Sequence, residues 1–90
     1  MSGRSKTIKI TNRRGLHARA SAKFVNLASG LAARIEVEKD GNRVVGTSIM
    51  GLMMLGAAMG DRITIHCEGE GCDEAMRELT ALVEGKFGEE

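Results

Sequence analysis

The chain has 90 residues with 42% hydrophobic and 28% charged content, and its 13 basic and 12 acidic residues leave a formal net charge of +1. This composition is typical of one globular domain over residues 1–90, and the balanced charge with only two aromatic residues, Phe24 and Phe87, argues against nucleic-acid binding. No apolar run approaches the roughly 20 residues that span a bilayer, and residues 1–15 hold no apolar signal core, so we expect a cytoplasmic protein without membrane insertion.

The first predicted elements are a strand and a helix. From Lys6 to Asn12 polar and apolar residues alternate, which indicates a half-buried strand, and residues 12–15 follow as a loop. Beyond the loop, apolar residues recur at helical spacing, and Gly30 is expected to end this helix in a left-handed cap. The apolar positions are Ala20, Phe24, Leu27, Ala28 and Leu31.

The middle of the chain predicts a hairpin and a short helix. Alternation over residues 33–37 indicates a second strand, and Asp40-Gly41 supplies the positive-φ residues of a tight turn into a third strand, Arg43–Val45. Ser48 is a good N-cap residue for a short helix over Ile49–Leu55, and the glycines between residues 56 and 60 release the chain from it.

The last third predicts one more strand and one more helix. Ile63, Ile65 and Cys67 alternate with polar residues, and apolar residues between Cys72 and Val83 follow helical spacing. The element order is therefore β-α-β-β-α-β-α. We expect an α/β (α+β) two-layer open-faced sandwich, in which three helices cover one face of a four-stranded antiparallel sheet and the other face meets solvent.

A candidate site lies where the first loop becomes a helix, in the run Gly15-Leu16-His17-Ala18-Arg19. The first amides of a helix have no intrahelical partners and form an anion site. A neutral imidazole at His17 is a usable nucleophile near pH ~7, and Arg19 could bind the oxygens of a phosphoryl group on it. The alternative is that His17 is an ordinary polar surface residue.

Other reactive residues give weaker signals. His66 lies on the outward side of a predicted strand, where a solvated role is expected. Cys67 and Cys72 fit neither a C-x-x-C pair nor a zinc spacing, so we expect them to stay reduced and structural. No P-loop, catalytic triad, cofactor fingerprint or paired metal ligands appear, so we expect no cofactor, no metal and no free-standing enzyme.

Together, Gly15-Leu16-His17-Ala18-Arg19 and Ser48-Ile49-Met50-Gly51 resemble the HPr family, the phosphocarriers of the bacterial phosphoenolpyruvate-dependent phosphotransferase system. The resemblance spans nearly the whole chain in the same element order. It implies that His17 accepts a phosphoryl group on Nδ1 from enzyme I and donates it to IIA-type domains, with Arg19 assisting. The chain departs from the family pattern at Ala20, where the family usually has proline, and this makes the site less rigid.

The same resemblance assigns a regulatory role to Ser48, as the serine that a dedicated HPr kinase/phosphorylase modifies. It also implies that Ile49, Met50 and Met53 face outward as a docking surface, and flexible methionines suit a surface that must fit several partners. The alternatives are that Ser48 is only a helix cap and that the helix is a methionine-rich core helix.

Two functional hypotheses remain open from the sequence. The first is a monomeric phosphoryl carrier, a covalent intermediate in sugar transport rather than an enzyme. The second is a regulatory interaction module of the same fold in a nitrogen- or carbon-signalling branch, without a main role in sugar uptake.

Overall fold

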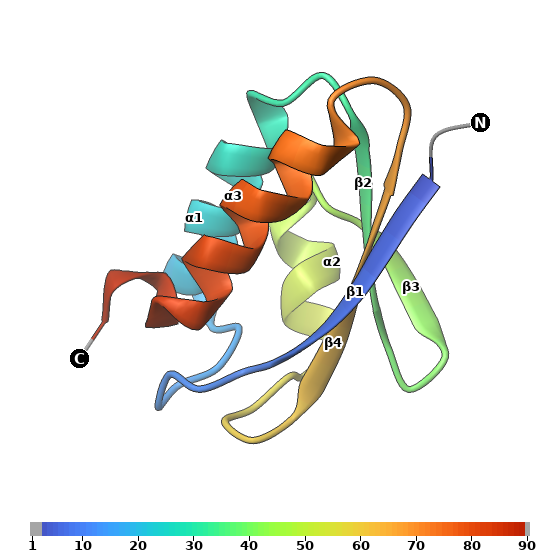
Figure 1. Cartoon of the computed structure of the whole chain (residues 1–90). Helices are drawn as coiled ribbons and strands as arrows, with labels where there is room; N and C mark the ends of the chain where they lie inside the picture. The colour runs from blue at the N-terminus through green and yellow to red at the C-terminus, as the bar shows by residue number, and fades with distance from the viewer. Residues whose placement is uncertain (1–2, 90) are drawn as a thin grey trace.

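The structure is a computed structural model and describes residues 3–89. Its elements are β1 (Gly3–Lys9), α1 (Ala18–Ser29), β2 (Arg34–Lys39), β3 (Asn42–Val45), α2 (Ile49–Met54), β4 (Arg62–Glu68), α3 (Cys72–Glu84) and a short 3-10 helix, η1 (Lys86–Gly88). All strand pairs are antiparallel, in the order β1-β4-β2-β3. The helices lie on one face of the sheet (Figure 1), so the predicted open-faced sandwich is confirmed.

The core lies between the sheet and the helices because the two central strands, β4 and β2, turn their apolar side chains to one face. Ile35 and Val37 of β2 and Ile63 and Ile65 of β4 are buried, and Phe24 of α1 is fully buried against them. Burial of one such side chain contributes about 1.5–3 kcal/mol. None of the helices within residues 3–89 is long and apolar enough to cross a membrane.

The structure corrects two details of the prediction. The first strand begins at Gly3 rather than Lys6, because pairing with β4, from Gly3 opposite Glu68 onward, extends through polar residues that carry no apolar alternation. Gly30 ends α1 in a right-handed conformation, with φ −87° and ψ −1°, so the expected left-handed cap is wrong. Its amide instead donates to the carbonyl of Leu27, which tightens the last turn.

The predicted hairpin turn is confirmed. Asp40 and Gly41 both have positive φ, 51° and 83°, as the tight turn between β2 and β3 requires.

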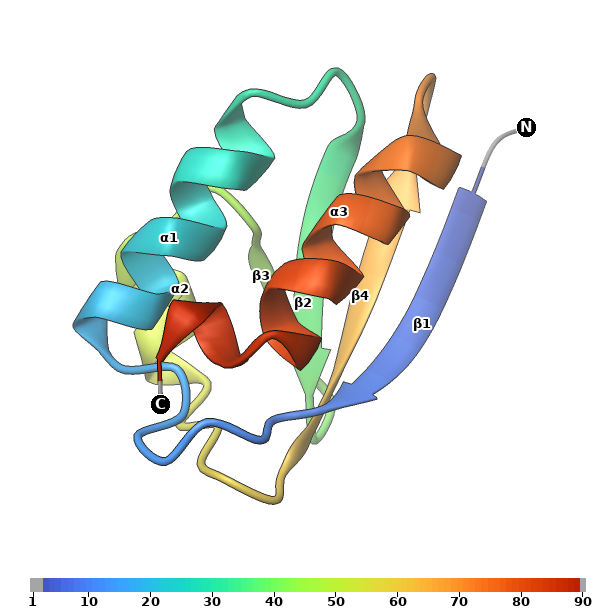
Figure 2. The same cartoon turned by 60° about the vertical axis from the view of Figure 1, so that its left-hand side comes forward.

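A C-terminal segment (residues 85–89) that the sequence did not predict turns back toward α1. Phe87, at φ 54°, is fully buried, and its carbonyl accepts a 2.7 Å hydrogen bond from Lys23 Nζ of α1. Figure 2 shows this segment returning from the end of α3 to the beginning of α1. The return brings Glu89 to the loop that precedes α1.

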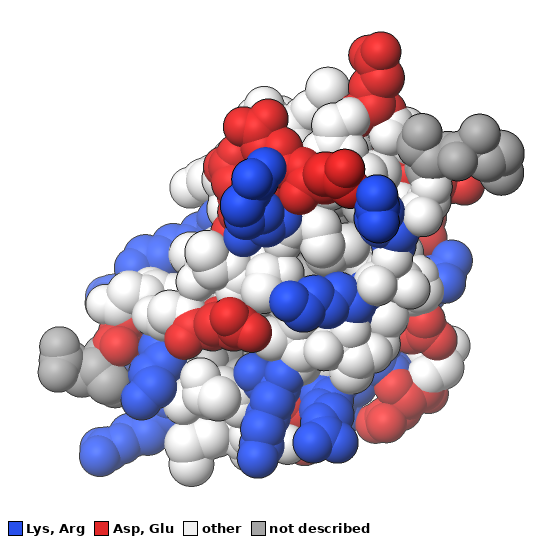
Figure 3. Space-filling model, in the orientation of Figure 1, with Lys and Arg blue, Asp and Glu red and all other residues white. Residues whose placement is uncertain are grey.

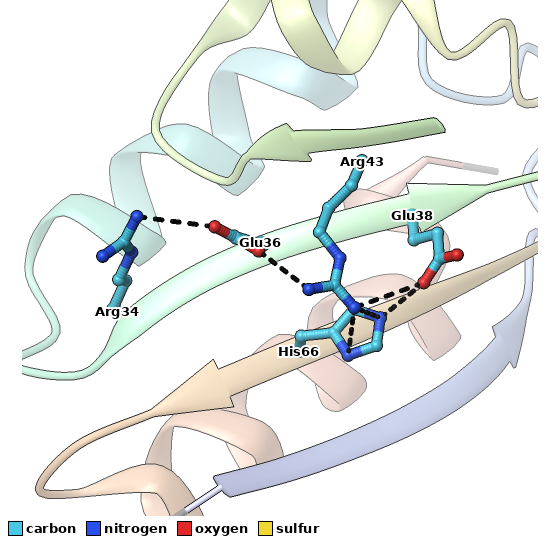
Figure 4. Close-up of polar contacts among 5 residues, drawn as sticks. All are labelled: Arg34, Glu36, Glu38, Arg43 and His66. Atoms are coloured by element: carbon cyan, nitrogen blue, oxygen red, sulfur yellow. Dashed lines mark hydrogen bonds and ion pairs between the residues drawn. The ribbon is translucent and has the colours of Figure 1, made fainter. Parts of the chain in front are cut away.

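The outer face of the sheet carries a charged cluster rather than isolated solvated residues (Figure 4). His66 of β4 points outward as predicted, but its Nε2 lies 2.7 Å from Glu38 Oε1 and 3.0 Å from Arg43 Nη2. Arg43 also contacts Glu36 at 3.3 Å, and Glu36 contacts Arg34 at 3.6 Å. The expectation of a merely solvated His66 therefore missed its two partners, one from the adjacent strand β2 and one from β3 beyond it.

Candidate functional site

The loop that precedes α1 is held against the segment between α2 and β4. The amide of Leu16 donates to the carbonyl of Ala57 at 2.9 Å. Gly15 has φ +62°, and a Cβ there would lie 2.2 Å from the oxygen of Ala57. Both its conformation and this close approach require glycine, so Gly15 fixes the path by which the chain enters α1.

His17 occupies the N-cap position of α1, with extended backbone angles of φ −76° and ψ −178°. Its carbonyl accepts the first helical bond, from Ser21, at 2.8 Å. The following amides, those of Ala18, Arg19 and Ala20, donate to no acceptor within residues 3–89. Unpaired amides at a helix N-terminus attract anions, so the imidazole and an anion site lie at the same helix end.

The ring of His17 is held from one side by the C-terminal segment. Its Nε2 lies 2.6 Å from Oε2 of Glu89, and the two side chains are only 17% and 18% exposed. Asn12, which is fully buried, donates its Nδ2 to Oε1 of Glu89 at 3.1 Å and to the carbonyl of Gly15 at 2.9 Å. Asn12 thus joins the loop, the carboxylate and the histidine in one network.

The hydrogen bond from Asn12, followed by that from His17, lowers the pKa of the Glu89 carboxyl below its ordinary value of 4.5. Glu89 is therefore ionised at neutral pH and can only accept hydrogen bonds. The ring must place a proton on Nε2, and Nδ1 has no hydrogen-bond partner within residues 3–89. A neutral ring in this arrangement offers the lone pair of Nδ1 for reaction.

Three basic residues lie close to His17 in the sequence. Arg13, Arg14 and Arg19 are all exposed and make no ion pair within the described part of the chain. In Figure 3 basic side chains are most numerous at the lower end of the view, whereas acidic ones gather over the upper end, where α3 begins. The guanidinium groups are available to an anion.

Ser48 is the N-cap of α2, and its Oγ accepts a 2.9 Å hydrogen bond from the amide of Gly51. The capping interpretation of Ser48 is thus confirmed. The helix α2 packs against α1. Ser48 is at the start of α2, whereas Ala57, which bonds to the loop before His17, follows its end.

The helix α2 is only partly a core helix. Leu52 is fully buried, whereas Ile49, Met50 and Met53 are 40%, 68% and 40% exposed, as the sequence predicted for outward residues. The structure adds exposed methionines that the sequence reasoning did not select, Met54 in α2 and Met59 in the loop after it. We call these five exposed residues the apolar surface of α2.

Sequence reasoning missed two members of the His17 network, Asn12 and Glu89. Asn12 had the pattern of an ordinary strand or turn residue, and Glu89 is 72 positions from His17 along the chain. Only the return of the C-terminal segment could reveal them. Cys67 and Cys72 are buried in the core, and burial, together with the side-chain interaction with Cys72, raises the pKa of the Cys67 thiol to about 12. Residues 3–89 hold no cluster of metal-ligating side chains.

Known proteins share the sequence and the fold of this chain. A family model described as "PTS HPr component phosphorylation site" matches residues 4–85. The phosphocarrier protein HPr of Neisseria meningitidis serogroup A is 52% identical over 83 residues, 92% of this chain and 93% of that protein. The phosphocarrier protein HPr of Cupriavidus necator is 44% identical over 80 residues, 89% of this chain and 90% of its own.

A solved structure of HPr from Thermoanaerobacter tengcongensis superimposes with a TM-score of 0.92 at 46% identity, over 97% of this chain and 98% of that one. Sequence, fold and element order agree over nearly the whole domain. The chain therefore belongs to the HPr family of phosphocarrier proteins of the phosphotransferase system.

Proposed function

We propose that this chain accepts a phosphoryl group on His17 from phosphorylated enzyme I and donates it to IIA-type domains, as a monomeric cytoplasmic carrier in sugar transport. The observation that carries the proposal is the position of the His17 ring. One ring nitrogen is bound to Glu89 and the other is unpaired within residues 3–89, and His17 is the N-cap of a helix whose first amides have no acceptor there.

The transfer needs little more than this geometry. The lone pair of a ring nitrogen attacks phosphorus as the bond between phosphorus and the donor breaks, and the electron pair of that bond returns to the donor. The amides at the start of α1 and the guanidinium of Arg19 would stabilise the phosphoryl oxygens, which carry negative charge throughout. Ala20, which stands where the family usually has proline, lies in the first turn of α1 and is buried. The helix therefore forms from this position without a proline.

The apolar surface of α2 is the proposed docking surface for both the donor and the acceptors. Two contacts connect this surface to the site. The helix α2 packs against α1, and the carbonyl of Ala57, shortly after α2, accepts a hydrogen bond from the amide of Leu16, the residue before His17. A carrier must present its phosphoryl group to partners of different shape, and flexible, polarizable methionine side chains adapt to more than one of them.

Ser48 is proposed as a regulatory site for the kinase/phosphorylase. A phosphate on Ser48 would add about −1.5 to −2 charges at one end of the apolar surface of α2. The charge would oppose docking, while the start of α2 tolerates it. Docking, rather than folding, should then respond to this modification.

The direct test is a transfer assay with purified partners. We expect the chain, incubated with enzyme I and phosphoenolpyruvate, to take up one acid-labile, alkali-stable phosphoryl group and to lose it on addition of a IIA-type domain. A chain that binds these partners but is never phosphorylated would instead be the regulatory interaction module. Discharge by several different IIA-type domains, assayed one at a time, would identify its acceptors.

A further inference from the structure

The C-terminal segment contributes a side chain to the phosphoryl-transfer site that the sequence pattern around His17 does not include. We propose that Glu89 is a positioning residue that selects Nδ1 of His17 as the phosphoryl acceptor by holding the proton of the ring on Nε2. This inference rests on the proposed function for its consequence in transfer, but the state of the ring can be measured without any phosphorylation.

The first argument is chemical complementarity at Nε2. Oε2 of Glu89 lies 2.6 Å from Nε2, and an ionised carboxylate has lone pairs but no proton to donate. The pair therefore forms with the hydrogen on Nε2. The neutral ring then carries its lone pair on Nδ1, so one contact fixes both the orientation of the ring and the nitrogen that reacts.

The second argument is that the carboxylate itself is held on both oxygens. Oε1 accepts from the buried Asn12 at 3.1 Å, and the amide of Asn12 cannot rotate without losing both of its acceptors, Glu89 and the carbonyl of Gly15. The backbone of the segment is fixed by the burial of Phe87 and by the bond from Lys23 to its carbonyl. A group held in this way can orient another side chain.

The third argument is the balance of charge during transfer. As Nδ1 forms its bond to phosphorus, the ring keeps the proton on Nε2 and becomes a phosphoimidazolium with a positive charge beside Glu89. When the phosphoryl group leaves, the electron pair of the phosphorus–nitrogen bond returns to Nδ1 and the ring is neutral again. No proton has to move in either direction. The carboxylate stabilises the charged form, as an aspartate does for the imidazolium of a catalytic triad.

The substitution Glu89→Gln gives a sharp prediction because Asn12 determines how the new amide lies. The oxygen of the Gln side chain must accept from Asn12, so its NH₂ group faces Nε2 of His17. An NH₂ group only donates, which forces Nε2 to accept and moves the ring proton to Nδ1. We expect the variant to fold but to carry its proton on the nitrogen that should react.

The experiment measures the ring first and the reaction second. Nitrogen NMR of the unphosphorylated protein should show the Nε2–H tautomer of His17 in the unchanged chain and the Nδ1–H tautomer in Glu89→Gln. Phosphorylation by phosphoramidate, a donor that requires no docking, should slow by roughly 10- to 100-fold, as when a carboxylate that orients a metal-binding histidine is removed. Glu89→Ala should lose the tautomer preference and should slow as well.

Glu84→Gln is the matched control, because Glu84 is exposed at the end of α3 and makes no ion pair within residues 3–89. It should leave the tautomer and the rate unchanged. If Glu89→Gln keeps both the Nε2–H tautomer and the rate of the control, Glu89 does not position the ring. If the unchanged chain shows the expected tautomer but takes up no phosphoryl group, the proposed function fails while the positioning of the ring by Glu89 stands.

Discussion

The protein contains two histidine–carboxylate pairs of nearly equal geometry, one on each side of the sheet. Nε2 of His17 lies 2.6 Å from Glu89, and Nε2 of His66 lies 2.7 Å from Glu38. At His17 the second ring nitrogen has no partner within residues 3–89, and the residue is the N-cap of a helix. At His66 a guanidinium nitrogen of Arg43 lies 3.3 Å from Nδ1 and 3.0 Å from Nε2.

This difference shows that a carboxylate partner does not by itself make a histidine a phosphoryl acceptor. The guanidinium of Arg43 lies within 3.3 Å of both ring nitrogens of His66, and its positive charge opposes the positive charge that the ring would acquire on reaction. The helices within residues 3–89 lie on the opposite face of the sheet from His66 (Figure 1), so their amides are not available to a phosphoryl group there. The surroundings of the pair therefore decide its chemistry.

The largest expected effect separates the two histidines directly. His17→Ala should abolish phosphorylation by enzyme I, because the nucleophile is removed, whereas His66→Ala should be phosphorylated at the rate of the unchanged chain. The measurement is incorporation of labelled phosphoryl group, with circular dichroism to show that both variants fold. Phosphorylation of the His17 variant would assign the acceptor to another residue.

A second prediction concerns the loop that places His17 at its helix end. Gly15→Ala forces a Cβ to within 2.2 Å of the Ala57 oxygen at a positive φ, and should lower the free energy of unfolding by roughly 1–3 kcal/mol. Gly41→Ala is the matched control, since its φ is +83° but a Cβ there meets nothing within 4 Å. Urea denaturation of both variants measures how much stability the contact with Ala57 costs. Equal losses of unfolding free energy in the two variants would mean that backbone strain alone causes the effect.

The arginines near the two histidines should also differ. Arg19→Ala should slow phosphoryl transfer through His17 by about tenfold or more, because one charge-assisted contact is worth roughly 1.5–3 kcal/mol while the helix amides remain. Arg43→Ala, beside His66, should leave transfer unchanged. Single-turnover kinetics with enzyme I measures both. A loss as complete as that of the His17 variant would mean that Arg19 does more than assist.

Ser48 gives a smaller and more specific effect. Ser48→Asp should raise the KM of enzyme I for this chain by up to about tenfold, equivalent to roughly 1.4 kcal/mol of docking free energy, and should preserve stability because aspartate also caps helices. Ser48→Ala loses the bond to Gly51 and should cost about 0.5–2 kcal/mol of stability with an unchanged KM. Equal KM values in the two variants would reduce Ser48 to a helix cap.

The smallest effect is a pH dependence that the two pairs share. His66 lowers the pKa of Glu38, and Asn12 with His17 lowers that of Glu89, both from 4.5. A carboxyl whose pKa is lowered by folding stabilises the protein above its unfolded pKa, and this contribution is lost as the pH falls through the folded value.

The difference in melting temperature between the unchanged chain and Glu38→Gln or Glu89→Gln should therefore be largest above pH 4.5. It should disappear as the solution becomes more acidic. Only Glu89→Gln should impair phosphorylation. A stability difference that persists in acid would mean that the carboxylates act through packing rather than through charge.

The elements with regular periodicity could be predicted from the sequence, and so could the residues that act locally. The alternation in β2 and β4 and the helical spacing in α1 and α3 report burial on one face, and the N-cap role of Ser48 depends only on its neighbours in the chain. His17 was found because a loop, a helix start and an arginine follow one another in sequence.

The rest depended on contacts between distant residues. Glu89 lies beside His17 because Phe87 is buried, and the burial of Phe87 cannot be predicted from its neighbours in the sequence. The partners of His66, Glu38 and Arg43, are brought to it by the register of β2, β3 and β4. Glu36 of β2 pairs with His66, so Glu38 is diagonal to it on the same face, and Arg43 of β3 pairs with Glu38. The right-handed end of α1 at Gly30 likewise follows from the path into β2 and not from the residue type.

We expect His17, and not His66, to carry the phosphoryl group, on the ring nitrogen opposite Glu89. Phosphorus–nitrogen correlated NMR of the chain after reaction with enzyme I and phosphoenolpyruvate identifies both the residue and the ring nitrogen in one spectrum. The expected result is a single phosphoryl group on Nδ1 of His17. A phosphoryl group on Nε2 of His17, or on either nitrogen of His66, would contradict it.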